Sequence, residues 1–189
     1  MILKKSFYNR NTVKVAKELL GKYLIHKTKD GTTIGKIVET EAYLSNDPGS
    51  HSSIGKTKRN EKMFGKPGKA YIYLIYGMYN CFNVVTKPKG IGEAVLIRAL
   101  EPVSGINLMK KRRNTNNIKN LCTGPAKLAI AMALNSDLNG ADLTKPPLKI
   151  MQKENSPLKI TKTTRIGITK GSELALRFYI KDNQFISRK

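Results

Sequence analysis

The chain has 189 residues, of which 35 are Lys or Arg and 13 are Asp or Glu, so its formal net charge at pH 7 is +22. No apolar run approaches the roughly 20 residues that a membrane-spanning helix needs, and the start of the chain lacks the apolar segment of a signal peptide. Two cysteines are too few for a disulfide framework or a Cys-x-x-Cys zinc site, which indicates a reduced, cytoplasmic compartment. The positive charge favours nucleic acid or an anionic membrane as partner, although a Lys-rich coding bias would also produce it.

The first part of the chain predicts one helix, two strands and a long loop. Thr12 would cap the helix and Gly21 would end it, because the apolar side chains between them share one stripe. Asp30 and Gly31 would form the turn between the strands. Residues 45–69 are rich in Gly, Ser, Asn and Lys, so we expect a surface loop whose length is typical of a functional segment. The predicted elements are a helix over residues 12–21 and strands over residues 22–28 and 32–44.

The rest of the chain contains more predicted strands than helices. Two helices would begin after a Ser104 cap and at Pro125, and basic residues would end the first of them. We find no regular strand–helix alternation, no internal repeat and no linker, so we expect a single α+β domain over residues 1–189. The predicted strands cover residues 70–76, 79–85, 93–102, 148–151, 165–169 and 174–180, the first two as a β-hairpin around Gly77-Met78.

A carboxylate pair at the end of the second predicted strand is the first candidate for chemistry. At a period of two, Glu39, Glu41 and Tyr43 share one face of the strand. An acid on the DNA-binding side of a basic protein would repel its ligand, so its presence suggests a general base for water. The alternative is that both glutamates pair with lysines on a solvated face, and spacing alone favours that alternative.

The predicted hairpin carries aromatic side chains as far as its turn. Tyr71 and Tyr73 alternate with aliphatic residues, and Tyr76 and Met78 fall at the tip around Gly77. Core packing explains bulky side chains at an exposed turn poorly, whereas minor-groove binders use such residues as a wedge between base steps. Aromatic packing on a sheet remains a good explanation for Tyr71.

Three further polar residues stand out by their context. Arg98 lies within an apolar strand and needs a partner, for which Glu41 is the candidate. His51 falls in the long loop, and Asn83 follows Cys81 by two residues. Basic residues could contact phosphates, although each taken singly is more typical of a solvated side chain. They are Lys56, Lys58, Arg59, Lys62, Lys66, Lys69 and Lys110 to Arg113.

In this order, the motifs resemble those of the alkyladenine (3-methyladenine) DNA glycosylase family. The resemblance runs from about residue 6 to residue 186 and depends on ETEAY, the following His, KPGKAYIYLIYGMYNCFNVV, EAVLIRALEP, LCTGPAKLAIAMALN and LRFY. It implies an α+β domain with a curved, largely antiparallel sheet, flanking helices and a protruding hairpin that inserts into DNA. The loops HSSIGKTKRN and ITKGSELALRFY are shorter than the family pattern, which affects the expected phosphate contacts and the floor of the site.

The resemblance also implies a role for each matched residue. Glu41 matches the carboxylate that activates water, Arg98 helps to hold that water, and the backbone carbonyl of Ile166 is its third contact. The remaining residues match the base pocket and the DNA contacts. They are Tyr43, His51 and Tyr73 as walls around the extruded base, Asn83 as the screen of the purine edge, Tyr76 and Met78 as intercalating residues, and Arg59, Asn60 and Tyr79 as DNA-binding residues.

The implied activity is that of a monofunctional DNA glycosylase in base excision repair. Its partner would be double-stranded DNA containing 3-methyladenine or 7-methylguanine, with hypoxanthine and ethenoadenine as further candidates, and the enzyme would act as a monomer without metal or other cofactor. A helix-hairpin-helix glycosylase is a weaker match, because Gly90-Ile91-Gly92 precedes a strand and not a helix. A non-enzymatic basic minor-groove DNA-binding protein is the alternative from another class.

Overall fold

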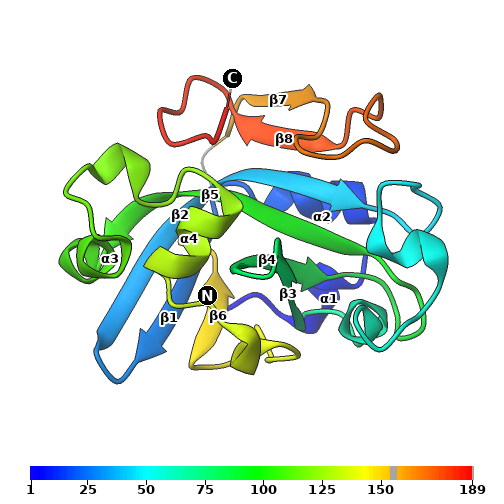
Figure 1. The fold of residues 1–189 in the computed structure, drawn as a ribbon, viewed down its shortest axis with the longest axis horizontal. Coiled ribbons are helices and arrows are strands. Elements are labelled where there is room, and N and C mark those ends of the chain that lie inside the picture. Colours follow the sequence, from blue (N-terminus) through cyan, green and yellow to red (C-terminus); the bar gives the residue numbers. More distant parts are fainter. Residues whose placement is uncertain (154–156, 189) are drawn as a thin grey trace.

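One antiparallel sheet of eight strands organises the computed structural model, which describes residues 1–153 and 157–188. Its main path has the order β3-β4-β5-β2-β1-β6, and β8 pairs with β2 and carries β7 on its other edge (Figure 1). The predicted α+β class is therefore confirmed. The strands are β1 (Tyr23–Thr28), β2 (Gly31–Tyr43), β3 (Ala70–Ile75), β4 (Tyr79–Val85), β5 (Ala94–Ser104), β6 (Leu148–Met151), β7 (Ile160–Thr163) and β8 (Arg177–Ile180).

Short helices cover the central strands. Helix α2 packs on β2 and β5, whereas α4 packs on β4 and β5 and is drawn in front of the sheet in Figure 1. Apolar side chains from α2, α4 and the central strands, including Leu19, Leu128 and Ile97, form one buried cluster. The helices are α1 (Lys5–Tyr8), α2 (Thr12–Leu19), α3 (Ile106–Arg113) and α4 (Pro125–Ala131), with 3₁₀ turns η1 (His51–Ile54), η2 (Glu61–Phe64), η3 (Ile118–Asn120) and η4 (Ser136–Leu138).

The pairing of β2 with β5 is irregular where the two glutamates lie. Ile37 pairs with Leu100 and Glu39 with Ala99, but Thr40 then pairs with Ile97, so the register shifts on both sides of Glu39. The second shift leaves Arg98 as an extra residue on β5. A β-bulge of this kind re-aims a side chain. It turns the Arg98 guanidinium toward the carboxylates of Glu39 and Glu41.

Two predicted helix caps are wrong. The side chain of Asn11, not Thr12, caps α2 by accepting a hydrogen bond from the Lys14 amide at 3.0 Å. The Thr12 hydroxyl instead donates to the buried Glu93 carboxylate at 2.5 Å. Ser104 is the last residue of β5, and Gly105, with a φ of 73°, is the N-cap of α3. A Cβ on Gly105 would lie 2.4 Å from a backbone oxygen, so close packing decides this boundary.

The strand predicted over residues 165–169 is also wrong. The strand in this region is β7, Ile160–Thr163, whose side chains are only half-buried or exposed. Apolar residues in a short run fit a buried strand and a buried loop equally well. Here Ile166 and Ile168 belong to a loop that lines a cavity. The other predicted strands and the hairpin around Gly77-Met78 are present, with boundaries within a few residues.

Residues 45–69 form an ordered loop with the two short 3₁₀ turns η1 and η2. Several of its polar side chains are buried, among them Asp47, Ser50 and Asn60. Asn60 donates to the carbonyls of His51 and Gly55 at 2.8 and 2.9 Å and accepts from the Thr57 amide at 2.6 Å. These contacts fold the segment onto itself, and this gives His51 a fixed place beside the sheet.

Candidate active site

A cavity of about 290 Å³ opens between the hairpin strands β3 and β4, the end of β2, η1 and the loop around Ile166. Its wall brings together residues that are far apart in the sequence. Of the predicted site residues, those that line it are Tyr43, Arg59, His51, Tyr73, Tyr76, Asn83, Arg98 and Ile166. Met63, Tyr71, Cys81, Leu96 and Pro125 line the same cavity and were not predicted for it.

Glu41 lies behind this wall, and its side chain is fully buried. Its Oε2 accepts a hydrogen bond from the Tyr43 hydroxyl at 2.9 Å, and its Oε1 accepts one from the Ile166 amide at 2.9 Å. Arg98 Nη1 is 3.4 Å from the same Oε1. The predicted ion pair of Arg98 with Glu41 is present. All three partners line the cavity, whereas Glu41 itself does not, so its carboxylate lies directly behind them.

The structure gives Glu39 and Glu41 no lysine partners among the described residues, unlike the solvated face that spacing alone favoured. Burial raises the pKa of Glu41, and Glu39 adds to this, while Arg98, the Ile166 amide and Tyr43 act in the opposite direction. A carboxylate with a raised pKa is a stronger base when ionised. The site therefore has a carboxylate that is both buried and hydrogen-bonded in one orientation.

Aromatic rings form the opposite wall of the cavity. The rings of His51 and Tyr73 have centroids 4.4 Å apart, and Tyr71 lies 5.4 Å from Tyr73. His51 Nδ1 hydrogen bonds to the Tyr71 hydroxyl at 2.9 Å. Burial, with a contribution from Arg59, lowers the pKa of His51 below its ordinary value, so the ring is neutral at neutral pH. The wall offers flat, uncharged ring faces.

Asn83 lines the cavity, but its amide group is used within the sheet. The Nδ2 nitrogen donates to the carbonyls of Tyr71 and Cys81 at 3.1 and 3.4 Å. Backbone hydrogen bonding of this kind is common for an Asn near a turn. The amide NH₂ therefore does not face the cavity as a free donor, and any screening of a purine edge by Asn83 would depend on shape.

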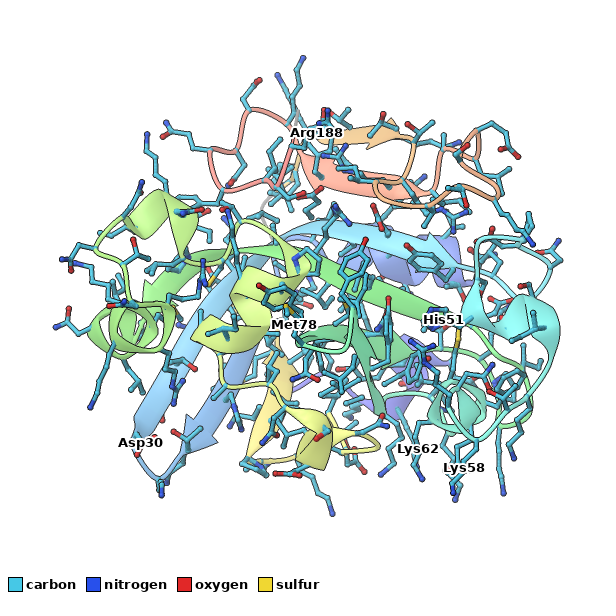
Figure 2. All side chains as sticks on the ribbon, in the orientation of Figure 1. Asp30, His51, Lys58, Lys62, Met78 and Arg188 are labelled. Carbon is cyan, nitrogen blue, oxygen red and sulfur yellow. The ribbon has the colours of Figure 1, made fainter. Side chains whose placement is uncertain are left out.

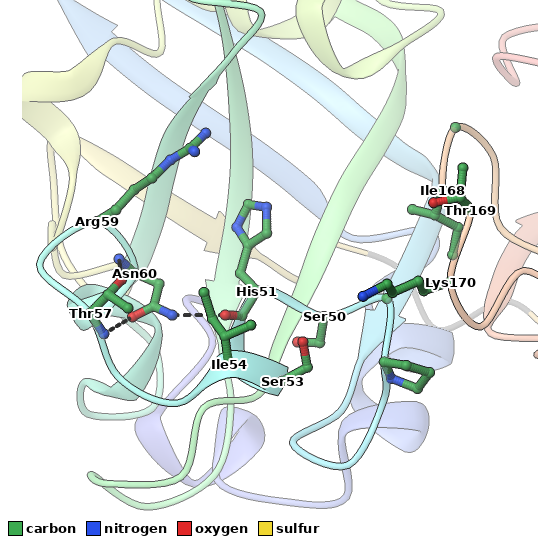
Figure 3. A pocket seen from close by; sticks show the side chains of 13 residues that line it. Ser50, His51, Ser53, Ile54, Thr57, Arg59, Asn60, Ile168, Thr169 and Lys170 are labelled. Carbon is green, nitrogen blue, oxygen red and sulfur yellow. Dashed lines mark hydrogen bonds between the residues drawn. The ribbon is translucent and has the colours of Figure 1, made fainter.

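A second cavity of about 370 Å³ adjoins the first beyond His51 (Figure 3). The loop that carries Ile168, Thr169 and Lys170 faces η1 across it. Arg59 lines both cavities and donates to the Leu74 carbonyl at 3.2 Å. Asn60 is only 3% exposed and fully engaged in the loop, so it holds the loop and has no free group for a phosphate.

An unpredicted ion pair joins the two loops that border the cavities. Arg165 forms a bidentate salt bridge with Asp47, one arm of which is 2.8 Å long, and both side chains are almost fully buried. Arg165 also donates to the Ala42 carbonyl at 3.1 Å and lies 4.7 Å above the Tyr43 ring. A Cβ on Gly49 would lie 2.5 Å from a backbone oxygen of the facing loop. We call this Arg165–Asp47 pair the clamp. It fixes the positions of the Tyr43 ring and of the neighbouring Ile166 amide.

The hairpin tip differs from the rest of the site because it is exposed. Tyr76 and Met78 are 83% and 66% exposed, and Tyr79 is 39% exposed. Tyr76 and Gly77 have φ values of 53° and 70°, and the Met78 amide donates to the Ile75 carbonyl at 3.2 Å. This is a tight turn with two left-handed residues. Figure 2 labels Met78 near the centre of the view, with His51, Lys58 and Lys62 to one side of it.

Within residues 1–153 and 157–188, no group of three or more His, Cys, Asp or Glu side chains comes together as metal ligands. In the same residues no helix is long and apolar enough to cross a bilayer.

Comparisons with known proteins agree with the geometry. The sequence model of the family described as methylpurine-DNA glycosylase matches residues 6–184. A protein from Methanoculleus marisnigri is 51% identical over 193 residues, one from Carboxydothermus hydrogenoformans is 50% identical over 191 residues, and both alignments cover 100% of each chain. A Francisella tularensis protein is 49% identical over 182 residues, which is 94% of each chain. All three carry the name "Putative 3-methyladenine DNA glycosylase".

Proposed function

Because the chain belongs to the methylpurine-DNA glycosylase family, we propose that it excises 3-methyladenine and related alkylated purines from duplex DNA by hydrolysing the N-glycosidic bond. The observation that carries the proposal is the Glu41 carboxylate, which is buried but is joined by hydrogen bonds and an ion pair to Tyr43, Arg98 and Ile166 in the wall of an aromatic cavity. The formal charge of +22 supports binding to a polyanion.

The first step is extrusion of the damaged nucleotide. A base inside a duplex hides its glycosidic bond, so it is rotated out at a cost of a few kcal/mol in lost stacking. Tyr76 would fill the gap in the stack, with Met78 beside it, because both are exposed and apolar at the turn. Damaged bases that pair poorly flip at lower cost, which is one source of selectivity.

The extruded base would stack between Tyr43 on one side and His51 and Tyr73 on the other. An alkylated purine such as 3-methyladenine or 7-methylguanine carries positive charge, and a cation over an aromatic face gains about 0.5–2 kcal/mol. A neutral His51 serves this better than a protonated one, and the lowered pKa of His51 keeps it neutral. Hypoxanthine and ethenoadenine would gain stacking only.

Glu41 would then remove a proton from a water that attacks C1′ as the base departs. Arg98 and the backbone carbonyl of Ile166 would hold that water, since both residues line the cavity, Arg98 contacts Glu41, and the Ile166 amide donates to Glu41. The negative charge of Glu41 would also stabilise the oxocarbenium character at C1′. The water supplies the hydroxyl at C1′ and its proton passes to Glu41, while the electron pair of the broken N-glycosidic bond leaves with the base and neutralises a cationic alkylated purine.

Asn83 would act as a rigid steric screen against guanine. Two backbone carbonyls fix its amide, so a purine N2 amino group that meets this side chain cannot displace it without breaking both hydrogen bonds. Leaving the Asn83 amide and its two carbonyl partners unpaired costs roughly 1–3 kcal/mol, which gives about a tenfold to hundredfold bias against guanine. Asn83→Ala is expected to raise release of unmodified guanine relative to 3-methyladenine. An unchanged ratio in a folded, active variant would remove Asn83 from this role.

Water as nucleophile implies a monofunctional enzyme that leaves intact abasic sites. Among the described residues that line the cavity there is no lysine to attack C1′, and Lys170 lines only the neighbouring cavity. Borohydride is therefore expected to trap no covalent protein–DNA adduct, and chelators to leave excision unchanged. A trapped adduct would mean that an amine attacks in place of water.

The deciding experiment is release of free base from DNA methylated with dimethyl sulfate, together with abasic-site formation in single-lesion duplexes. We expect 3-methyladenine among the released bases and abasic sites that piperidine cleaves. Binding to the same DNA without release would favour a non-enzymatic minor-groove protein. In the same assay a Glu41→Gln variant should release little base, and Glu173→Gln, at an exposed glutamate, is its control for the general effect of removing a negative charge.

A further inference from the structure

The segment after β8 returns to the buried carboxylate of Glu39. In Figure 1 the chain loops back along β8, and Figure 2 labels Arg188 beside that strand. The Ser187 amide donates to Glu39 Oε2 at 2.6 Å, and the Ser187 hydroxyl donates to Glu39 Oε1 at 2.9 Å. Arg177 Nε donates to Oε1 at 2.6 Å and also binds the carbonyl of Arg188 through Nη2. Glu39 is thus enclosed by a segment that is 148 residues away in the sequence.

The same Ser187 hydroxyl also contacts Arg98. Arg98 Nε donates to the Ser187 Oγ at 3.0 Å, while its distance to Glu39 Oε1 is 3.4 Å. A serine hydroxyl can donate once and accept at the same time, and this one does both. The Ser187 hydroxyl therefore lies between the Arg98 guanidinium and the Glu39 carboxylate. It accepts a hydrogen bond from the first and donates one to the second.

Arg98 is divided between two carboxylates. Its Nε side faces Glu39 and Ser187, whereas Nη1 faces Glu41 at 3.4 Å. Because a guanidinium is planar and its donors point in fixed directions, holding Nε at one place decides where Nη1 lies. We propose that Ser187 is a positioning residue that holds Arg98 toward Glu41 and prevents its collapse onto Glu39.

The position of Arg98 between Glu39 and Glu41 affects the pKa of Glu41. Arg98 is the largest influence that lowers the pKa of Glu41, against the raising effect of burial and, more weakly, of Glu39. The described titratable and charged groups that interact with Glu41 come from β2, β4, β5 and the loop before β8. They are Glu39, Tyr43, Cys81, Arg98 and Arg165.

Removal of the hydroxyl would shift this balance. In Ser187→Ala the Nε of Arg98 loses an acceptor, and Glu39 loses one of its donors. The arginine and Glu39 would then approach each other directly, which withdraws Nη1 from Glu41. With Arg98 further away, the Glu41 carboxylate holds its proton to higher pH.

The proposal rests on the proposed function, and the pH dependence of single-turnover excision tests it. At neutral pH we expect the rate constant in Ser187→Ala to fall about tenfold, the scale of one lost hydrogen bond to a charged group. The acid limb of the pH–rate profile is expected to move to higher pH while DNA affinity stays unchanged. Ser187→Thr, which keeps the hydroxyl, should restore both, and the exposed Ser136→Ala should match wild type.

A uniform loss of rate at every pH, with the acid limb in place, would overturn the proposal and leave Ser187 a purely structural residue. A carbon-13 titration of the Glu41 carboxyl provides a readout that needs no excision. Its resonance is identified by its loss in Glu41→Gln, and we expect its pKa to be higher in Ser187→Ala than in wild type. An equal pKa in both proteins also overturns the proposal. Absence of base release by wild type would contradict the proposed function alone.

Discussion

The carboxylate cluster and the hairpin tip use opposite physical conditions. Glu39 and Glu41 have fully buried side chains whose oxygens all accept hydrogen bonds or contact arginines. Tyr76 and Met78, by contrast, extend into solvent at a turn. The first region is held in one geometry by contacts from several distant segments, whereas the second is held by a single turn.

This difference separates the contribution of each region to folding stability from its contribution to DNA binding and excision. Removing one member of a buried charge cluster leaves another charge without compensation, so both stability and chemistry should change. A substitution at the exposed tip removes almost no buried contact, so it should not lower stability, and its main effect should be on the interaction with DNA. Variants in the two regions can therefore be compared by the same pair of measurements, excision rate and free energy of unfolding.

The largest expected effect on excision belongs to Glu41→Gln. Loss of a general base typically costs about 10²–10⁴ in rate, so we expect single-turnover excision to fall by that range with DNA binding retained. The glutamine fits the site because its oxygen can accept from the Ile166 amide and its NH₂ can donate to the Tyr43 hydroxyl, which can rotate. Near-normal excision would contradict the role of Glu41 and shift attention to Glu39.

The Arg165–Asp47 clamp should give the largest loss of stability. Arg165→Ala leaves Asp47 buried without its partner, which typically costs about 3–5 kcal/mol of unfolding free energy. The partly exposed pair Arg10–Glu18 is the matched control, and Arg10→Ala should cost less than about 1 kcal/mol. Urea unfolding measures both. Equal losses would show that burial of the clamp adds nothing.

Local pattern was sufficient for the parts of the molecule in which neighbours in sequence are neighbours in space. Alternation on one strand placed Tyr43 on the same face as Glu41, and their hydrogen bond confirms it. The hairpin around Gly77-Met78 has a local turn signal and was predicted correctly. The need of a lone arginine in an apolar strand for a partner also led to the right pair, Arg98 and Glu41.

Long-range contacts could not be predicted in this way. The Arg165–Asp47 pair joins residues 118 positions apart, and Ser187 meets Arg98 across 89 positions. Nothing in the local pattern distinguishes Asp47 or Ser187 from solvated loop residues. The apolar residues at positions 165–169 predicted a strand, but they belong to a loop that lines a cavity. Such a loop also needs apolar residues, so the local pattern does not separate the two. The burial of Asp47 and Arg165 can be recognised only from the folded structure.

The pH dependence of stability sharpens the contrast at Glu41. Burial raises the pKa of Glu41 above its ordinary value of 4.5, so the folded state binds the proton more tightly than the unfolded state. Stability from this group is therefore complete below pH 4.5 and is lost as the pH rises through the folded-state pKa. We expect the unfolding free energy of Glu41→Gln, relative to wild type, to increase as the pH rises from 4 to 8. A pH-independent difference would contradict this.

The smallest effect on stability is expected at the hairpin tip, and its sign is opposite. Tyr76 has a φ of 53°, a left-handed conformation that costs a bulky residue about 1 kcal/mol and that asparagine tolerates well. Tyr76→Asn should therefore raise the unfolding free energy by about 0.5–1 kcal/mol while it lowers excision of paired lesions about tenfold, since the stacking of one aromatic ring is worth about 1–3 kcal/mol. Lesions in unpaired contexts should lose less, because less stacking must be replaced.

Lys87 provides the matched control for this last variant. It is a non-glycine residue with a φ of 66° that lies in the turn between β4 and β5, outside the hairpin tip. Lys87→Asn relieves the same kind of strain, so it should gain similar stability with excision unchanged when the enzyme is in excess over DNA. If Tyr76→Asn lost paired and unpaired lesions equally, the ring would have no part in replacing the extruded base. A gain of stability without any loss of excision would lead to the same conclusion, because the strained conformation of Tyr76 would then serve no DNA contact.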